Sequence, residues 1–388
     1  MKKVFFLLLL VLILAACKPP KLAKKLPPMF LIGHTMETGL EPSFIISEDF
    51  DMDGNLDLIA TNSGDHTFSY YKGIGDGTFK DQIVFNTGKD PICVAAGLFN
   101  ADAFLDLAVL NYADQTVRIF LNTKSGSFRD TGVFLHPGKI PINLAAADFN
   151  HDGMDDLVVT MRYHKVEVML AKGNGKFTDP VGIAVKGQPT GLVTGDYNHD
   201  KKTDVAVALA GSGNTGVQIL WGKDDGTFEP SELFKGGGQP LTIVNIDANG
   251  DGLVDFVTSS NVLHAMTAIL NKGDKSFEAL RDFASGTFPK FVAAADFTGD
   301  GLTDIAVSNS TDDAITVSVG NGDGTFTYPP IYHRVDEYPQ GMVVGDFNKD
   351  GLIDIAVTCR DKRIIDILLK KNMVNPKPHY PDKEKKTA

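Results

Sequence analysis

The nonapeptide that begins at residue 49 contains four carboxylates and no lysine or arginine: Asp49, Asp51, Asp53 and Asp57. Like charges this close repel one another unless a cation lies between them. Oxygen atoms at positions 1, 3 and 5 can surround a hard cation, glycine at position 6 permits the sharp turn, and a carbonyl at position 7 adds a ligand. The carboxylate at position 9 closes the loop. The pattern favours calcium over zinc, which prefers cysteine and histidine, and over magnesium, which keeps more of its water.

Related nonapeptides recur along the whole chain. They begin at Leu98, Asp148, Asp196, Asp247, Asp296 and Asp346. A regular period of about fifty residues is typical of propellers and other repeat folds. In the second repeat, strands are predicted at 91–96, 106–110, 116–122 and 131–135, with the nonapeptide as the first turn and a Gly-x-Phe turn at 126–128. Seven units of four short antiparallel strands predict an all-β fold, a seven-bladed β-propeller.

The two ends of the repeat region complement each other. Residues 31–38 correspond to a fourth strand with no first three strands before it, and the seventh repeat ends after its third strand at 364–369. We predict that these two segments pair and close the ring, which removes the exposed sheet edges of a linear array.

The repeats resemble the FG-GAP repeats of integrin α-subunit propellers and the VCBS-type repeats of exported bacterial proteins. The resemblance covers residues 30–370 and rests on the Asp-x-[Asp/Asn]-x-Asp-Gly-x-x-Asp motif in sevenfold repetition. It implies calcium in the turn between the first and second strands of most blades. It does not identify a ligand, because such propellers serve adhesion, carbohydrate binding and scaffolding alike.

Five loops keep the ligand pattern, so we expect about five structural calcium ions. The side-chain ligands of the first, third, fifth, sixth and seventh loops are Asp49, Asp51, Asp53 and Asp57; Asp148, Asn150, Asp152 and Asp156; Asp247, Asn249, Asp251 and Asp255; Asp296, Thr298, Asp300 and Asp304; and Asp346, Asn348, Asp350 and Asp354. The position-7 carbonyls belong to Asn55, Met154, Leu253, Leu302 and Leu352. The alternative is that these residues only form turns and hold no ion.

Two loops depart from the pattern, and we expect both to be empty. The second begins with Leu98 and has Ala103 in place of the glycine. The fourth has Lys201 at the glycine position, followed by Lys202, and these two lysines can supply positive charge in place of a metal.

The first residues are typical of a secretory segment. Lys2 and Lys3 precede an apolar run at 4–16 that is too short to span a bilayer. The run ends in Leu-Ala-Ala-Cys at 14–17, which resembles a bacterial lipobox and implies cleavage before Cys17 and lipidation of that cysteine. The predicted organisation is therefore a signal peptide (1–16), a lipidated cysteine with a Pro/Lys-rich tether (17–29), the propeller (30–370) and a disordered tail (371–388). The protein is then exported and lipid-anchored to the cell envelope, at the outer membrane if the source is Gram-negative.

Cysteine content and charge agree with this reading. After cleavage only Cys93 and Cys359 remain, in the second and seventh repeats, so we predict two free, packed thiols. The net charge is −12, and 22 of the 49 acidic residues lie in the seven nonapeptides. The acidity therefore belongs to the loops and says nothing about a partner.

In a four-stranded meander, successive turns alternate between the two faces of the ring. The acidic loops and the Gly-x-Phe turns therefore share one face, and we expect a ligand on the other. That face is predicted to carry Tyr112, Arg162, Tyr163, His164, His264, Arg334, Tyr338 and Arg360, with Lys89, Lys139, Gln188, Gln239 and Lys290 in the connections between blades. Aromatic, guanidinium and amide groups suit sugars, peptides or anionic polymers, although polar turns are also common without any ligand.

The resulting hypothesis is a monomeric binding or adhesion module for an extracellular glycan or protein, with no nucleic-acid partner. An envelope scaffold for another surface protein is the first alternative. A polysaccharide-acting enzyme is the second, and it has less support because no acid and base pair at a defined spacing. We therefore assign no catalytic residue.

Overall fold

The computed structural model describes residues 29–124, 126–211 and 213–371. In these ranges all regular elements are β-strands, and no helix is long and apolar enough to span a bilayer. The predicted signal peptide (1–16), the lipidation site Cys17, the tether as far as Pro28 and the tail from residue 372 lie outside the described residues.

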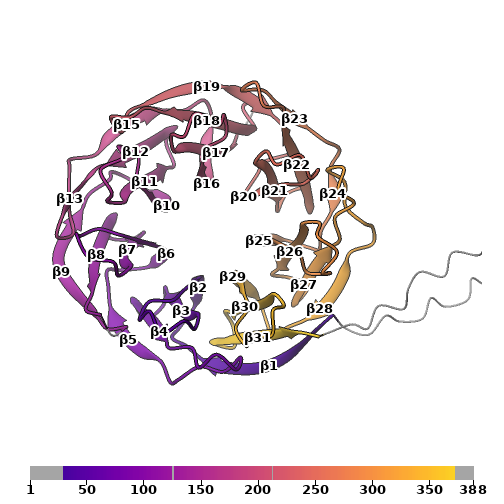
Figure 1. Ribbon diagram of the computed structural model, residues 1–388, viewed down its shortest axis with the longest axis horizontal. Coiled ribbons are helices and arrows are strands. Elements are labelled where there is room, and N and C mark those ends of the chain that lie inside the picture. Colours follow the sequence, from indigo (N-terminus) through magenta and orange to yellow (C-terminus); the bar gives the residue numbers. More distant parts are fainter. Residues whose placement is uncertain (1–28, 125, 212, 372–388) are drawn as a thin grey trace, which may run out of the picture.

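Seven four-stranded antiparallel units surround a common axis, which confirms the predicted propeller (Figure 1). The innermost strand of each blade, from blade 1 to blade 7, is β2 (Pro42–Glu48), β6 (Pro91–Gly97), β10 (Pro141–Ala147), β16 (Gln188–Gly195), β20 (Thr242–Ile246), β25 (Pro289–Ala295) and β29 (Pro339–Gly345). The second strands are β3 (Asp57–Asn62), β7 (Asp106–Asn111), β11 (Asp156–Met161), β17 (Asp204–Ala210), β21 (Asp255–Ser260), β26 (Asp304–Asn309) and β30 (Asp354–Cys359).

The two outer positions complete each blade. The third strands are β4 (Thr67–Tyr71), β8 (Thr116–Asn122), β12 (Lys165–Met169), β18 (Gly216–Gly222), β22 (Ala265–Asn271), β27 (Ala314–Ser318) and β31 (Ile364–Lys370). The outermost strands are β5 (Ile83–Asn86), β9 (Phe128–Leu135), β15 (Val181–Ala184), β19 (Phe228–Lys235), β23 (Phe277–Ala279) with β24 (Phe283–Ala284), β28 (Ile331–Arg334) and β1 (Phe30–Glu37). A short hairpin, β13 (Ala171–Gly173) and β14 (Lys176–Phe177), follows β12.

The hydrophobic core is divided among the interfaces between blades. The second strands are short apolar runs that are buried along almost their whole length, because both faces of a blade are covered by its neighbours. Between blades 1 and 2, for example, the Phe68 and Phe120 rings meet edge to face with their centroids 5.0 Å apart. Each blade is thus stabilised by the blade on either side.

The N-terminal strand closes the ring as predicted. β1 pairs antiparallel with β31, from Phe30 opposite Lys370 to Glu37 opposite Ile364. In Figure 1 the two strands, from opposite ends of the chain, lie side by side in blade 7. Met29, the last residue assigned to the tether, is 1% exposed and packs with the propeller, and its carbonyl accepts the Lys371 N–H at 3.1 Å.

Both cysteines of the propeller are buried free thiols, as predicted. Burial raises the pKa of the Cys93 thiol to about 12 and that of Cys359 well above its usual range. Both groups therefore remain neutral and act as packing residues.

Removal of residues 29–38 should open the ring. The deletion leaves the β31 edge without a partner, and an unpaired edge can pair with another chain. We expect a lower melting temperature and concentration-dependent association, measured by calorimetry and by light scattering after size-exclusion chromatography. Leu31→Lys is the matched control, because its side chain is 42% exposed and the backbone pairing is kept. An unassociated deletion variant that melts with the wild type would contradict the closure argument.

Candidate metal loops and the opposite face

All seven acidic loops connect the first and second strands of their blades and lie against the outer turn of the next blade. Backbone hydrogen bonds make this contact directly at several interfaces. Gly77 N–H donates to the Phe347 carbonyl, Gly175 N–H to that of Phe99, and Gly324 N–H to that of Ala248, each at 3.0 Å. The loops and the Gly-x-Phe turns therefore share one face of the ring, as expected from the order of the strands.

Aromatic pairs explain the Gly-x-Phe motif. The aromatic residue at position 2 of a loop packs edge to face against the phenylalanine of the next blade's turn, with centroids 5.2–5.8 Å apart in five interfaces. These pairs are Phe50–Phe128, Phe99–Phe177, Phe149–Phe228, Phe297–Phe30 and Phe347–Phe79. Phe30 of the closing strand thus has the same role as the turn phenylalanines.

The aspartate at position 9 is fully buried in every loop. One oxygen accepts a backbone N–H from the start of its own loop and the other accepts one from the end of the third strand. In the second loop, Asp106 accepts the Phe99 N–H at 3.2 Å and the Asn122 N–H at 2.8 Å. Burial raises the pKa of Asp106 to about 7, although the two N–H groups oppose the shift. Because Asp106 accepts these two N–H groups although the second loop lacks the ligand pattern, the position-9 aspartate holds the blade together independently of that pattern.

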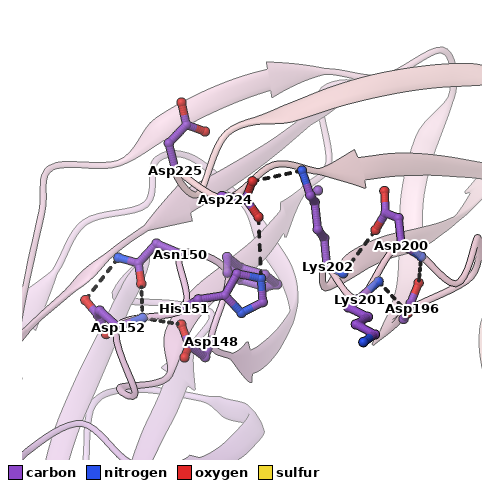
Figure 2. Close-up of polar contacts among 12 residues, drawn as sticks. Asp148, Asn150, His151, Asp152, Asp196, Asp200, Lys201, Lys202, Asp224 and Asp225 are labelled. Atoms are coloured by element: carbon purple, nitrogen blue, oxygen red, sulfur yellow. Dashed lines mark hydrogen bonds and ion pairs between the residues drawn. The ribbon is translucent and has the colours of Figure 1, made fainter.

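The third loop represents the five intact loops (Figure 2). The Asp148 carboxylate accepts the N–H groups of Asp152 at 3.2 Å and Gly153 at 2.9 Å, and Asp152 accepts the Met154 N–H at 2.9 Å. Gly153 has a φ of 84°, in the left-handed region that glycine adopts without strain. Asn150 donates its Nδ2 to Asp152 at 3.0 Å and accepts the Asp152 N–H, so hydrogen bonds join positions 1, 3 and 5 of the turn.

The first loop offers a direct test of whether its residues fit a cation. Asp49, Asp51 and Asp57 each place a carboxylate oxygen within 4.8 Å of the others. The Asp51 side chain is only 7% exposed, and its Oδ1 is buried with no hydrogen-bond partner in the described chain. A buried, unpaired carboxylate oxygen costs free energy unless a cation meets it. The donor set therefore fits a hard cation such as calcium.

A lysine outside the nonapeptide, directly after β4, also reaches the first loop. Lys72 Nζ contacts the carboxylates of Asp51 and Asp53, the latter at 2.8 Å, and this contact lowers the pKa of Asp53. Lys72 directly precedes Gly73, whose N–H donates to the position-9 aspartate of this blade, Asp57. The other six blades have apolar residues there, namely Leu121, Leu170, Trp221, Leu270, Val319 and Leu369. A lysine at a position that is apolar in the other six blades is the sequence feature that could have indicated this contact.

The fourth loop keeps the backbone of the intact loops although it lacks the glycine. Lys201 adopts a φ of 67°, and its N–H donates to Asp196 at 2.9 Å, as Gly153 does to Asp148. Lys202 Nζ pairs with Asp224 at 3.0 Å, and Asp224 also faces His151 of the third loop at 4.0 Å (Figure 2). In the described chain neither lysine forms an ion pair with its own loop. The structure thus gives no support to the idea that these lysines replace a metal.

The second loop has a different backbone. Neither Ala101 nor Ala103 has a positive φ, whereas positions 4 and 6 of the other loops do. The Leu98 N–H donates instead to Asp155 of the third loop at 2.8 Å. The second loop therefore lacks the turn on which the predicted cage depends.

On the opposite face, the predicted ligand residues are spread over several blades. Only Tyr338 and Arg360 make a mutual contact, with the guanidinium carbon 4.5 Å from the ring centroid. His264 has a structural role, because its Nδ1 accepts the Phe288 N–H at 3.0 Å. Tyr163 is 64% exposed. Arg162, His164 and Arg334 are exposed and Tyr112 is half-buried, so no single site unites the eight residues.

Two pockets lie on this opposite face. One, of about 480 Å³, is lined by Leu40, Glu41, Gly64, Arg360, Asp361 and Arg363 between blades 7 and 1. The other, of about 250 Å³, is formed by the beginnings of all seven inner strands. Within it Phe44 and Phe291 meet edge to face at 5.2 Å although blade 7 separates their strands along the ring. Sequence reasoning missed this aromatic contact, because it depends on the diameter of the closed ring.

The fold and its loops define a class of protein, a seven-bladed propeller assembled from repeats with acidic loops. A family model described as FG-GAP-like repeat matches residues 49–109, 99–159, 148–207, 200–258, 247–307 and 296–357. The chain therefore belongs to the FG-GAP-like repeat family.

Solved structures of the same fold share little sequence with this chain. A lectin, BP39L from Burkholderia pseudomallei, is 13% identical, with a TM-score of 0.65 over 85% of this chain and 96% of the lectin. BBS1N, solved in complex with ARL6DN, is 12% identical, with a TM-score of 0.63 over 90% and 99%. A protein from Lactobacillus plantarum is 14% identical, with a TM-score of 0.56 over 84% and 88%. A search of the curated proteins finds no match. These likenesses support the fold alone.

Asp106→Ala should destabilise blade 2. The substitution leaves two buried N–H groups without a hydrogen-bond partner, and each unpaired group costs on the order of 1–3 kcal/mol. We therefore expect the free energy of unfolding to fall by about 2 kcal/mol or more. Urea unfolding in the presence of a chelator measures the effect without any contribution from metal. Asp179→Ala, at an exposed position, is the control and should change little. An Asp106→Ala protein as stable as this control would contradict the assigned role.

Proposed function

We propose that this protein is a lipid-anchored, calcium-stabilised binding or adhesion module of the cell envelope that recognises an extracellular glycan or protein. The observation that carries the binding part is the unequal use of the two faces. On the loop face, the repeated groups are occupied in joining each blade to the next. The opposite face carries two pockets and the stacked Tyr338–Arg360 pair, whereas the pocket of about 350 Å³ on the loop face is lined by the second acidic loop and the turns packed beside it. A ligand can bind there without disturbing the groups that hold the ring together.

The ligand classes of the structural neighbours are compatible with this proposal. BP39L is a lectin, and BBS1N was solved with a protein partner. Propellers of similar fold thus include a sugar-binding protein and a protein that binds another protein. The envelope location rests on the resemblance of residues 14–17 to a lipobox, and a lipid on Cys17 would place the propeller at a membrane surface, at the outer membrane if the source is Gram-negative.

The calcium proposal follows from the donor chemistry of the loops. The residues that would hold the ions are those of the first, third, fifth, sixth and seventh loops. A bound cation would offset the repulsion among the carboxylates of each loop and so contribute to folding stability. The role is structural, because the equivalent loop stands at the same place in each blade.

Carboxylates on the ligand face offer little support for an enzyme. Asp312 and Asp313 accept backbone N–H groups of Thr287 and Tyr338, and Glu337 pairs with Lys362 at 3.1 Å. These contacts are those of turn-stabilising residues. A scaffold for another surface protein remains the stronger alternative to a glycan-binding module.

Calcium should raise the melting temperature of residues 29–388, and chelation should reverse the effect, with about five ions bound per chain. Calorimetry with parallel metal analysis measures both quantities. Replacement of Asp148 and Asp152 by asparagine should remove one ion, whereas Asp102→Asn in the second loop should leave the count unchanged. No bound metal and no shift in melting temperature would show that the aspartates only form turns.

The first loop should respond differently from the others because calcium must displace the Lys72 ammonium. Lys72→Leu introduces the residue type found at this position in other blades. We expect it to increase the calcium affinity of the first loop severalfold, seen as tighter binding of one ion in a titration. Lys202→Leu is the control, because Lys202 pairs with Asp224 outside its loop. Equal titration curves for Lys72→Leu and wild type would contradict the competition.

A glycan array tests the binding proposal, and site-directed blocking tests the face. Lys139→Cys on the ligand face and Lys223→Cys beside the loop face introduce exposed thiols, while the native Cys93 and Cys359 are buried. Attachment of a polyethylene glycol maleimide at residue 139 should abolish sugar binding, and attachment at residue 223 should not. No signal on the array would reject glycan recognition and favour the scaffold, for which capture of a defined surface protein would be required.

A further inference from the structure

The mouth of the central channel is formed by equivalent residues of all seven blades. Each inner strand begins next to a proline, and the residue after that proline lines the pocket of about 250 Å³. From blade 1 to blade 7 these residues are Ser43, Ile92, Ile142, Thr190, Leu241, Lys290 and Gln340. Lys290 is the charged member of this ring. One residue further along the strands, the Phe44–Phe291 contact adds an apolar surface to the pocket.

The Lys290 ammonium has no counter-ion in the described chain. It forms no ion pair with the described residues, and it lies over the face of the Phe288 ring, 5.4 Å from the centroid. Burial lowers the pKa of Lys290, and the positive charge of Arg360 lowers it further. A half-buried cation beside a second cation is unfavourable unless an anion joins them.

Arg360 is held in place with part of its guanidinium free. It stacks on the Tyr338 ring and its Nε faces Asp361 at 3.1 Å. In the described residues its two terminal nitrogens have no acceptor. Stacking on an aromatic ring fixes the guanidinium plane, so less conformational entropy is lost when a ligand binds.

Amide groups without partners complete the mouth. The side-chain amide of Gln340 and the Nδ2 of Asn143 form no hydrogen bond within the described ranges, and both residues line the pocket. Free amides suit hydroxyl groups, and a volume of about 250 Å³ is below the usual range for drug-sized ligands, so it suits a small ring. An acidic peptide would supply the carboxylate but not several hydroxyls.

We propose that the channel mouth binds one uronic-acid residue of an acidic glycan. The Lys290 ammonium meets the carboxylate, and the amides of Gln340 and Asn143 bind sugar hydroxyls. Arg360, which lines the neighbouring pocket, adds positive charge that attracts the acidic glycan to this side of the ring. The inference rests on the proposed function, since it names the chemistry of the glycan and the place where it binds.

Calorimetric titration of the full chain in detergent micelles with trigalacturonate tests the proposal. The fully methyl-esterified trisaccharide is the matched probe, because it keeps the hydroxyls and lacks the charges. We expect the wild type to bind the acid at least about tenfold more tightly than the ester, and Lys290→Gln to lose about tenfold in affinity for the acid alone. Lys290→Arg should retain binding. Lys89→Gln is the control, because Lys89 is exposed in the connection before β6 and lies outside the pocket lining.

The outcomes separate this inference from the general proposal. If Lys290→Gln binds trigalacturonate as the wild type does, with unchanged melting temperature, the subsite is wrong. If the wild type binds neutral sugars on the array but not trigalacturonate, the subsite is wrong and the glycan-binding function stands. If it binds no sugar but captures a surface protein, both the subsite and the glycan function are rejected and the scaffold is supported.

Discussion

A buried aspartate that accepts N–H groups from two directions is the interaction on which each blade depends. Its carboxylate joins the start of the loop to the end of the third strand, so that one side chain fixes three segments of a blade. Full burial destabilises the charged form of this carboxylate, as the raised pKa of Asp106 indicates. The two N–H groups offset part of that cost, and each carboxylate oxygen keeps a further lone pair. The same aspartate can therefore hold the blade alone in the second loop and also serve as a cation ligand in the intact loops.

The position of this aspartate also determines how neighbouring blades meet. Once the loop is fixed, its position-2 carbonyl and aromatic ring are presented to the next blade, where a turn N–H and a phenylalanine meet them. Five interfaces have this aromatic pair, and the one between blades 6 and 7 requires a phenylalanine from outside the seven repeats. Phe30 supplies it, since its ring packs against Phe297 at 5.8 Å. The N-terminal strand that closes the ring thus makes the same aromatic contact between blades as the turns within the chain.

The sequence was sufficient for most of the fold because the repeating pattern is local. Each loop, strand and turn recurs with the same spacing, and the closing strand follows from residues 31–38, which correspond to a fourth strand without the first three. The candidate site was less accessible, because it depends on departures from the repeat. To predict the contact of Lys72 with the first loop, one must know the direction of a side chain at the end of a strand. To predict the Phe44–Phe291 contact, one must know the diameter of the ring. Lys201 occupies the left-handed region expected for glycine, with its N–H held by Asp196, so the missing glycine does not by itself exclude the turn of the fourth loop.

Departures from the repeat are where a symmetric fold can acquire a specific ligand. Seven equivalent positions at the channel mouth cannot recognise an asymmetric molecule if they carry similar side chains. One lysine among apolar and neutral polar residues breaks the equivalence, and the stacked Arg360 lies on the same side of the ring. Neither group contributes to the loop contacts that join the blades, so the charge at the mouth can change without loss of the fold. The same logic distinguishes Lys72 from Lys290. Lys72 lies among carboxylates that neutralise it, whereas Lys290 has no ion-pair partner among the described residues and is available to an anion from outside.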